Sequence, residues 1–237
     1  MSPRLLYGGT FDPIHLGHLQ VARTVARRLG APVYLLPSAD PPHRAAPGAS
    51  AVQRAHMLEL AIAGDPALRL DRRELHRDGP SYTVDTLAEV RAEVGADTPV
   101  VWILGIDSVL QLPAWHGWQR LPALANLLGV QRPGTRVGQA WLAERAPAAH
   151  ALLSPGWTTP ERLLRQPAGG YAALALRPLR RESASDVRAR LASGGDWRSL
   201  VPPAVAAFIV ATGLYGAVPA SAAIIKARRP PPSEDTR

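Results

Sequence analysis

GGTFDPIHLGH, residues 8–18, lies between a short apolar run and a segment with helical periodicity. The run before it is Leu5-Leu6-Tyr7, and the apolar residues after it recur at positions 19, 21, 22, 25, 26 and 29. This arrangement predicts a turn between a first strand and a first helix. In an open α/β sheet, such a turn lies at the carboxyl edge of the strands, where ligands bind.

The turn itself has the features of a phosphate site. Two glycines open it, so its backbone can come close to a ligand. Asp12-Pro13 is a plausible entry to the helix, because proline is tolerated in a first helical turn. The helix would then present unpaired N–H groups and a partial positive charge. His15 and His18 are three residues apart and would project from one side of that turn, which favours polyphosphate chemistry.

Other interpretations of this stretch are weaker. A single histidine near a helix start is usually an ordinary surface or capping residue. Here two histidines with a glycine between them follow a Gly-Gly turn, and this combination favours phosphate binding. The stretch matches neither the G-x-G-x-x-G dinucleotide fingerprint nor the G-x-x-x-x-G-K-[ST] P-loop, because the pattern and the lysine are both missing.

Strand and helix patterns alternate along the rest of the chain. Further strands are expected at residues 33–36, 68–70, 100–104, 127–130 and 171–176. Helices are expected at residues 50–62, 81–94, 138–153, 183–191 and 203–210 and after residue 105. The order predicts the α/β class, with a Rossmann-like open parallel sheet and helices on both faces. We expect one domain over residues 1–216 and a disordered, basic, Pro-rich tail over residues 217–237.

Composition excludes several classes of protein. With 237 residues, the chain is long enough for one large α/β domain with a sizeable core. It has no cysteine, which excludes a disulfide framework and Cys-ligated zinc and fits a reducing compartment. No apolar run is long enough to cross a membrane, and no secretory segment precedes the first strand. We therefore expect a soluble, cytoplasmic protein without a membrane partner.

The formal net charge of +8 raises the question of a nucleic-acid partner. The arginines form no long basic block and are interpreted as dispersed over helices and the tail. Examples are Arg23, Arg27, Arg28, Arg54, Arg72, Arg73, Arg120 and Arg162. A pocket for two anionic substrates also benefits from a positive field, so we expect no nucleic-acid partner.

Five further motifs allow both a structural and a functional interpretation. They are PPHR at 41–44, SYT at 81–83, GIDS at 105–108, LPAWHGW at 112–118 and SASDVR at 183–188. By composition alone, PPHR is an ordinary surface loop, and Ser81 and Ser183 are helix N-caps. Asp107 either caps a helix or binds a ribose hydroxyl or a metal-bound water. The two tryptophans of LPAWHGW are typical of packing residues.

The motifs together resemble a known family. Residues 8–18 resemble the G-x-F-D-P-x-H-x-G-H signature of the nucleotidyltransferase superfamily. PPHR, DRREL at 71–75 with SYT, GIDS with a downstream tryptophan, RPG at 132–134 and SASDVR resemble the bacterial nicotinate-nucleotide adenylyltransferases, over about residues 4–215. The resemblance implies a nucleotidylyl transferase fold. It also implies that ATP and nicotinate mononucleotide react to give deamido-NAD and pyrophosphate in NAD biosynthesis.

The resemblance also assigns roles to residues that match the family pattern. It implies that His15, His18 and Arg188 are catalytic. The implied ATP contacts are Gly8, Gly9, Thr10, Phe11, His15, Gly17, His18, Gly105, Asp107, Arg132, Ser183, Ser185 and Arg188. The implied mononucleotide contacts are Thr10, His43, Arg44, Tyr82, Thr83, Trp115 and His116. No residue is expected to bind a metal directly, since Mg²⁺ would be held mainly through the ATP phosphates.

Two departures from the family pattern lie next to the last motif. Glu182 stands where the pattern usually has an apolar residue, and Ser185 replaces a threonine. Neither change removes a hydroxyl group or Arg188. Asp186, at a variable position, adds a negative charge near the expected phosphate site.

Several alternatives stay open at this point. Nicotinamide mononucleotide or pantetheine phosphate could be the acceptor, and a cytidylyltransferase is a further candidate. A non-catalytic relative that binds a nucleotide or RNA is another, although intact His15, His18 and Arg188 argue against it. The sequence leaves open whether the protein forms a homo-oligomer.

Overall fold

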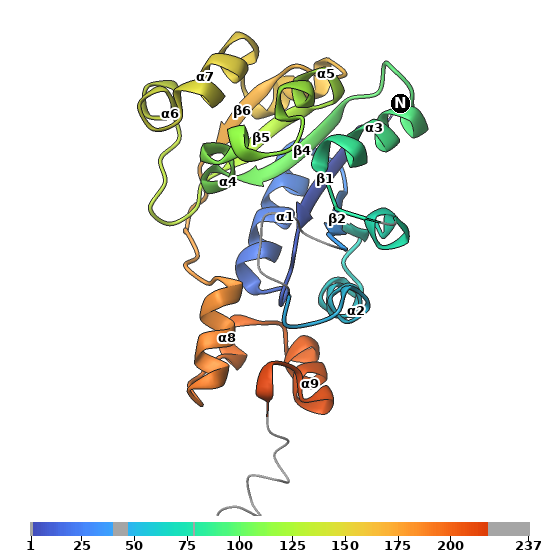
Figure 1. The fold of residues 1–237 in the computed structure, drawn as a ribbon, viewed down its shortest axis with the longest axis vertical. Helices are drawn as coiled ribbons and strands as arrows, with labels where there is room; N and C mark the ends of the chain where they lie inside the picture. The colour runs from blue at the N-terminus through green and yellow to red at the C-terminus, as the bar shows by residue number, and fades with distance from the viewer. Residues whose placement is uncertain (1, 40–46, 78, 218–237) are drawn as a thin grey trace, which may run out of the picture.

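Six parallel strands form the central layer of the molecule (Figure 1). The computed structural model describes residues 2–39, 47–77 and 79–217. Across these residues the strand order is β3-β2-β1-β4-β5-β6, and every neighbouring pair is parallel. The strands are β1 (Arg4–Gly9), β2 (Val33–Pro37), β3 (Leu68–Leu70), β4 (Val100–Gly105), β5 (Asn126–Val130) and β6 (Tyr171–Leu174). The predicted open parallel sheet is confirmed, and the order reverses between β1 and β4, where such sheets bind ligands.

Helices cover both faces of this sheet (Figure 1). The α-helices are α1 (Leu16–Leu29), α2 (Ala51–Ile62), α3 (Thr83–Val94), α4 (Ile106–Leu110), α5 (Leu121–Leu124), α6 (Gln139–Arg145), α7 (Pro147–Leu153), α8 (Ala184–Ala192) and α9 (Pro203–Thr212). Short 3₁₀ turns are η1 (Arg73–His76), η2 (Leu112–Ala114), η3 (Trp118–Arg120), η4 (Ser154–Gly156), η5 (Pro160–Arg165), η6 (Arg198–Leu200) and η7 (Leu214–Gly216).

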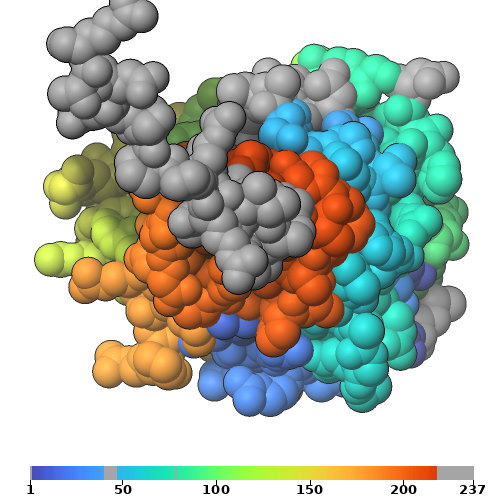
Figure 2. All heavy atoms as spheres, turned by 90° about the horizontal axis from the view of Figure 1, so that it is seen from below, coloured from blue at the N-terminus to red at the C-terminus, as the bar shows by residue number. Residues whose placement is uncertain are grey.

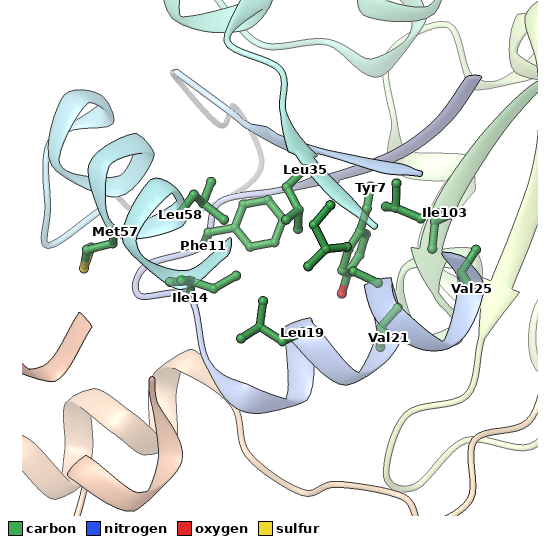
Figure 3. Close-up of a cluster of buried hydrophobic side chains, with 14 of the residues drawn as sticks. Tyr7, Phe11, Ile14, Leu19, Val21, Val25, Leu35, Met57, Leu58 and Ile103 are labelled. Atoms are coloured by element: carbon green, nitrogen blue, oxygen red, sulfur yellow. The ribbon is translucent and has the colours of Figure 1, made fainter. Parts of the chain in front are cut away.

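Alternation along the strands divides the core in two. In β4, Val101 and Ile103 point into the core beneath α1, whereas Trp102 points to the opposite face. The first core packs the sheet against α1, α2, α8 and α9, and Figure 3 shows its centre around Phe11 and Leu19. The second core packs the sheet against α3 to α7. Since β4 is buried on both faces, its sequence is a continuous apolar run, as expected for a central parallel strand.

The carboxyl-terminal elements α8, α9 and η7 pack on one side of the first core. Helix α9 packs on α2, and α8 contacts η7. Figure 2 shows α8 and α9, in orange and red, beside α2 in cyan at the lower end of the molecule. The last described residue is Ala217, so residues 218–237 of the predicted tail lie outside the described residues.

Three sequence expectations about helices were wrong in detail. Helix α1 begins at Leu16 and not at Asp12-Pro13, and its N-cap is His15. The expected helix at 138–153 is two helices, because Pro147 cannot continue α6 and instead begins α7. Helix α3 has Tyr82 and not Ser81 as its N-cap. In the part of the chain that the structure describes, no helix combines the length and apolar character needed to cross a membrane.

Candidate active site

A cleft of about 690 Å³ lies at the carboxyl ends of β1 and β4. Its walls come from segments that are far apart in the sequence: the end of β1, the start of α3, the residues after β4 and the start of α8. The predicted site residues that line it are Gly8, Gly9, Thr10, Phe11, His15, His18, Tyr82, Thr83, Gly105, Asp107, Trp115, His116, Arg132, Ser183, Ser185 and Arg188. His43 and Arg44 lie outside the described residues.

Close packing against a buried ring requires a glycine at position 8 of this cleft, whereas Gly105 lies beside the movable end of the exposed Asp107 side chain. A Cβ atom on Gly8 would lie 2.3 Å from the Trp102 ring, and one on Gly105 would lie 2.1 Å from Asp107 Oδ1. Gly17 is buried and does not line the cleft. Its missing Cβ leaves room for the His15 ring, since a Cβ there would lie 3.0 Å from His15 Nδ1.

The His15 and His18 rings stack at the start of α1. Their centroids are 3.6 Å apart, with 29° between the ring planes. Each ring caps the helix for the other: His15 Nδ1 accepts from the His18 backbone N–H, and His18 Nδ1 accepts from the His15 backbone N–H, both at 3.4 Å. A neutral imidazole that accepts at Nδ1 carries its proton on Nε2. Each ring of the pair therefore carries its proton on Nε2.

The electrostatic setting keeps His15 neutral. Burial, and then the positive charges of Arg132 and Arg180, lower its pKa from 6.5 to about 3. His15 Nε2 is buried and has no hydrogen-bond partner among the described residues. An unsatisfied donor at the wall of a cleft is costly unless a ligand or water pairs with it. The arrangement is suited to a phosphate oxygen.

Phe11 supports His18 from the core. Its ring lies edge-on to His18 at 5.0 Å and to Tyr7 at 5.6 Å, and Figure 3 shows Phe11 beside Tyr7 in the first core. Only 2% of Phe11 is exposed, so its ring holds His18 in place more than it offers surface to a nucleotide.

Asp12 is a site residue that the sequence did not reveal. It was expected at a helix entry, but its carboxylate is buried and accepts hydrogen bonds from Gly48 N at 2.9 Å and Ala49 N at 3.1 Å. The Tyr215 hydroxyl donates to the same carboxylate at 2.7 Å. Arg188, from α8, donates to the Asp12 carbonyl oxygen. Asp12 thus joins the first turn to α8 and to the carboxyl-terminal η7.

Tyr82, Thr83, Trp115 and His116 form a second wall of the cleft. Tyr82 and His116 stack with ring centroids 4.4 Å apart. Thr83 is the first residue of α3, so free backbone N–H groups of the helix start lie at this wall. Such groups suit a carboxylate or a phosphate.

Two further polar residues, Ser81 and Glu74, line the cleft beside this wall. Ser81, expected as an N-cap, instead accepts from Ala39 N at 3.0 Å and connects the start of α3 to the end of β2. Glu74 accepts from Thr86 Oγ1 at 2.7 Å, and burial raises the pKa of this glutamate. These contacts fix the orientation of the α3 start.

The remaining predicted residues lie around the β4 and α8 ends of the cleft. Gly105 is the N-cap of α4, so Asp107 is not the cap, and its carboxylate lies in the first helical turn. Ser183 is the N-cap of α8 and accepts from Asp186 N at 3.0 Å. Glu182 pairs with Arg180 at 2.9 Å, so its charge is directed to a neighbouring arginine.

Arg54, one of the dispersed arginines, lies on helix α2, but the sequence analysis did not predict its burial. It is fully buried and donates to three backbone carbonyls: Thr10 at 2.7 Å, Ala39 at 3.1 Å and Ala49 at 3.2 Å. These carbonyls belong to the segments after β1, after β2 and before α2. One sequence signal could have found it, because Arg54 is four residues before Leu58 and so lies on the buried stripe of α2.

The described residues contain no group of three or more His, Cys, Asp or Glu side chains that could hold a metal ion. Asp12, one of two buried carboxyl groups that line the cleft, is already engaged by backbone N–H groups and by Tyr215, and the other, Glu74, accepts from Thr86. The donor set therefore fits a cation that arrives with its own phosphate and water ligands.

Known proteins resemble this chain along most of its length. Residues 6–190 match the family model described as cytidylyltransferase-like. The probable nicotinate-nucleotide adenylyltransferase of Stenotrophomonas maltophilia is 50% identical over 221 residues, which cover 91% of this chain and 97% of the relative. The protein of the same name from Cronobacter sakazakii is 47% identical over 216 residues, covering 88% and 94% of the two chains.

A solved structure shares the fold. The nicotinic acid mononucleotide adenylyltransferase of Plasmodium falciparum, complexed with NaAD, superposes with a TM-score of 0.69. The match covers 92% of this chain and 99% of that one, at 15% sequence identity. Because close relatives match along nearly their whole length, the chain belongs to the nicotinate-nucleotide adenylyltransferase family of cytidylyltransferase-like proteins.

Proposed function

We propose that this protein transfers the adenylyl group of ATP to nicotinate mononucleotide and so forms deamido-NAD and pyrophosphate, a step of NAD biosynthesis. Family membership supports the reaction. The single observation that carries the proposal is the stacked His15–His18 pair, which shares one cleft with Arg188.

The chemistry needs little from the protein beyond position and charge. An oxygen of the mononucleotide phosphate attacks the α-phosphorus of ATP, the bond between that phosphorus and the bridging oxygen breaks, and pyrophosphate leaves with the electron pair. The attacking phosphate is already ionised at neutral pH, so no general base is required. Catalysis is then alignment of the two anions together with stabilisation of the charge that develops on the leaving group.

The triphosphate site would be formed by His15, His18 and Arg188. The Nδ1 atoms of both imidazoles accept backbone hydrogen bonds, so each ring carries its proton on Nε2 and could donate it in a hydrogen bond to a phosphate oxygen. A neutral His15 donates a hydrogen bond without repelling nearby arginines. Arg188 adds a permanent positive charge and several N–H donors. Ser183 and Ser185, at the start of α8, would complete this side of the site.

The mononucleotide would lie against the second wall. Trp115 offers an indole face to the electron-poor pyridine ring. The start of α3 at Thr83 offers N–H groups to the ring carboxylate, with His116 beside it. We assign the mononucleotide phosphate to Arg44 and His43, whose sequence position follows β2. Asp107 and Arg132 are assigned to the adenosine of ATP.

Magnesium would enter as part of the ATP substrate. It would neutralise phosphate charge and would keep most of its water ligands, in line with its preference for octahedral oxygen coordination. Chelation of magnesium should therefore abolish turnover, because it removes the cation that accompanies the ATP phosphates.

An acceptor panel tests the proposal. Purified protein is mixed with MgATP and one of three acceptors: nicotinate mononucleotide, nicotinamide mononucleotide or pantetheine phosphate. We expect pyrophosphate release and a dinucleotide product with nicotinate mononucleotide, and weaker turnover with the amide. Faster turnover with another acceptor would assign a different substrate, and failure with all three, without ATP binding by calorimetry, would reject the enzyme assignment.

A further inference from the structure

Three distant segments of the chain meet at Asp12. Its Oδ1 accepts from Ala49 N and from the Tyr215 hydroxyl, and its Oδ2 accepts from Gly48 N. Arg188 Nη1 lies 3.5 Å from Oδ2 and also donates to the Asp12 carbonyl oxygen. Because both carboxylate oxygens are held, the side chain has one orientation. Tyr215 supplies the contact that is most distant in sequence, 203 residues away.

Two residues next to Asp12 or bonded to it have unusual backbone conformations. Among the described residues, Phe11 and Tyr215 are the non-glycine residues with positive φ, at 50° and 57°. A bulky residue keeps this conformation only where its surroundings over-determine it, and such residues cluster at functional sites. Phe11 directly precedes Asp12, and Tyr215 is bonded to it.

Tyr215 is also held against the chain that leads into α2. A Cβ atom on Gly48 would lie 2.9 Å from the Tyr215 ring, so the ring packs on the glycine backbone. Burial, and then the hydrogen bond to Asp12, raise the pKa of Tyr215. The phenol therefore stays protonated at neutral pH and donates to the carboxylate. A neutral donor at 2.7 Å to a charged acceptor is a strong hydrogen bond.

The residues joined through Asp12 lie near both proposed substrate sites, the triphosphate site and the mononucleotide site. Arg188 belongs to the triphosphate side, whereas Gly48 and Ala49 follow Arg44 in the sequence. Asp12 lies between them and next to the first turn that carries His15 and His18. A small rotation of its carboxylate would change the spacing of these groups.

We propose that Tyr215 is a positioning residue for adenylyl transfer, which holds Asp12 so that Arg188 and the Gly48–Ala49 backbone keep one relative placement. This rests on the proposed function, and nothing in it requires Tyr215 to touch either substrate. The carboxyl-terminal η7 thereby becomes part of the catalytic geometry instead of only closing the core.

The test compares Tyr215→Phe with Tyr34→Phe, a matched control that removes a hydroxyl outside the cleft. We measure kcat, the KM for ATP and for nicotinate mononucleotide, and Tm. Loss of a hydrogen bond to a charged group corresponds to about a tenfold or larger effect. We expect kcat to fall about tenfold in Tyr215→Phe, together with a lower Tm than that of the control, because the lost hydrogen bond also stabilises the fold. Unchanged kcat, or a fall in Tm alone, would show a purely structural role and overturn the proposal.

A second measurement tests the route through Asp12. In an Asp12→Asn background, the added Tyr215→Phe change should have little further effect on kcat, and full additivity would overturn the proposal. Amide hydrogen exchange at Gly48 and Ala49 gives a readout that does not need turnover. It should be faster in Tyr215→Phe than in Tyr34→Phe, and equal exchange would count against the link. If the wild-type protein fails the acceptor panel, the exchange experiment still decides whether Tyr215 controls this backbone.

Discussion

Replacing Arg54 by methionine should strongly destabilise the protein. The change keeps an unbranched apolar stem in the buried position and removes all guanidinium donors. In the native protein these donors satisfy the carbonyls of Thr10, Ala39 and Ala49, at 2.7, 3.1 and 3.2 Å. Without Arg54, three carbonyl groups from the segments that frame the cleft lose their partner.

The magnitude follows from these contacts. A buried polar group left without a partner costs about 1–3 kcal/mol, so three such carbonyls set an upper range near 9 kcal/mol. Part of this is offset, because burial lowers the pKa of Arg54 and its removal relieves the cost of holding a charge in the interior. We expect a net loss of about 3–5 kcal/mol in the free energy of unfolding, a large fraction of the ~5–15 kcal/mol of a typical domain.

Urea denaturation at pH 7.5 measures the effect, with Arg23→Met as the matched control. Arg23 is half exposed on α1 and pairs with Asp65, so its loss should cost about 1 kcal/mol or less. Equal urea midpoints for the two variants would refute the assignment of Arg54 as the residue that ties the cleft segments together.

Three other predictions concern single site residues. Burial lowers the pKa of His15 to about 3 in the folded protein, whereas the same side chain has a pKa near 6.5 in the unfolded chain. As the pH falls below 6.5, His15 therefore binds a proton in the unfolded chain before it does so in the folded protein. The free energy of unfolding should then decrease by about 1.4 kcal/mol per pH unit between pH 6.5 and pH 3, and urea titrations of His15→Gln should lack this part of the slope. Arg44→Ala should raise the KM for the mononucleotide more than the KM for ATP. Equal effects on the two KM values in steady-state assays would show that Arg44 does not bind the mononucleotide phosphate. Trp115→Leu should raise the mononucleotide KM about tenfold through lost stacking, whereas an unchanged KM would remove Trp115 from the pyridine site.

The sheet was predictable because its signals are local. Each strand is a short apolar run, and β4 is buried on both faces, so its sequence shows no polar alternation that could suggest another structure. The His15–His18 pair was also predictable, since two residues three apart at a helix start must lie on one side. The motif resemblance then supplied the residues of the second wall, such as Trp115.

The contacts that organise the cleft were not predictable in the same way. Asp12 looks like a helix entry, but its partners are 36, 37 and 203 residues away, and no local pattern encodes them. Ser81 looks like an N-cap, yet its hydroxyl accepts a hydrogen bond from Ala39 N, 42 residues away in the sequence. In both cases a short polar side chain that satisfies local rules is used for a long-range contact. Arg54 differs from these two, since its spacing of four residues from Leu58 on α2 is a local signal that could have indicated its burial.

The most direct measurement of the central claim is the single-turnover rate of deamido-NAD formation in His18→Gln at saturating MgATP and nicotinate mononucleotide. His150→Gln, on α7 and outside the cleft, is the control. If the paired imidazoles stabilise the departing pyrophosphate, the His18 variant should react at least ~100-fold more slowly, while its affinity for ATP falls by less than about tenfold. A rate within about twofold of the control would contradict that role.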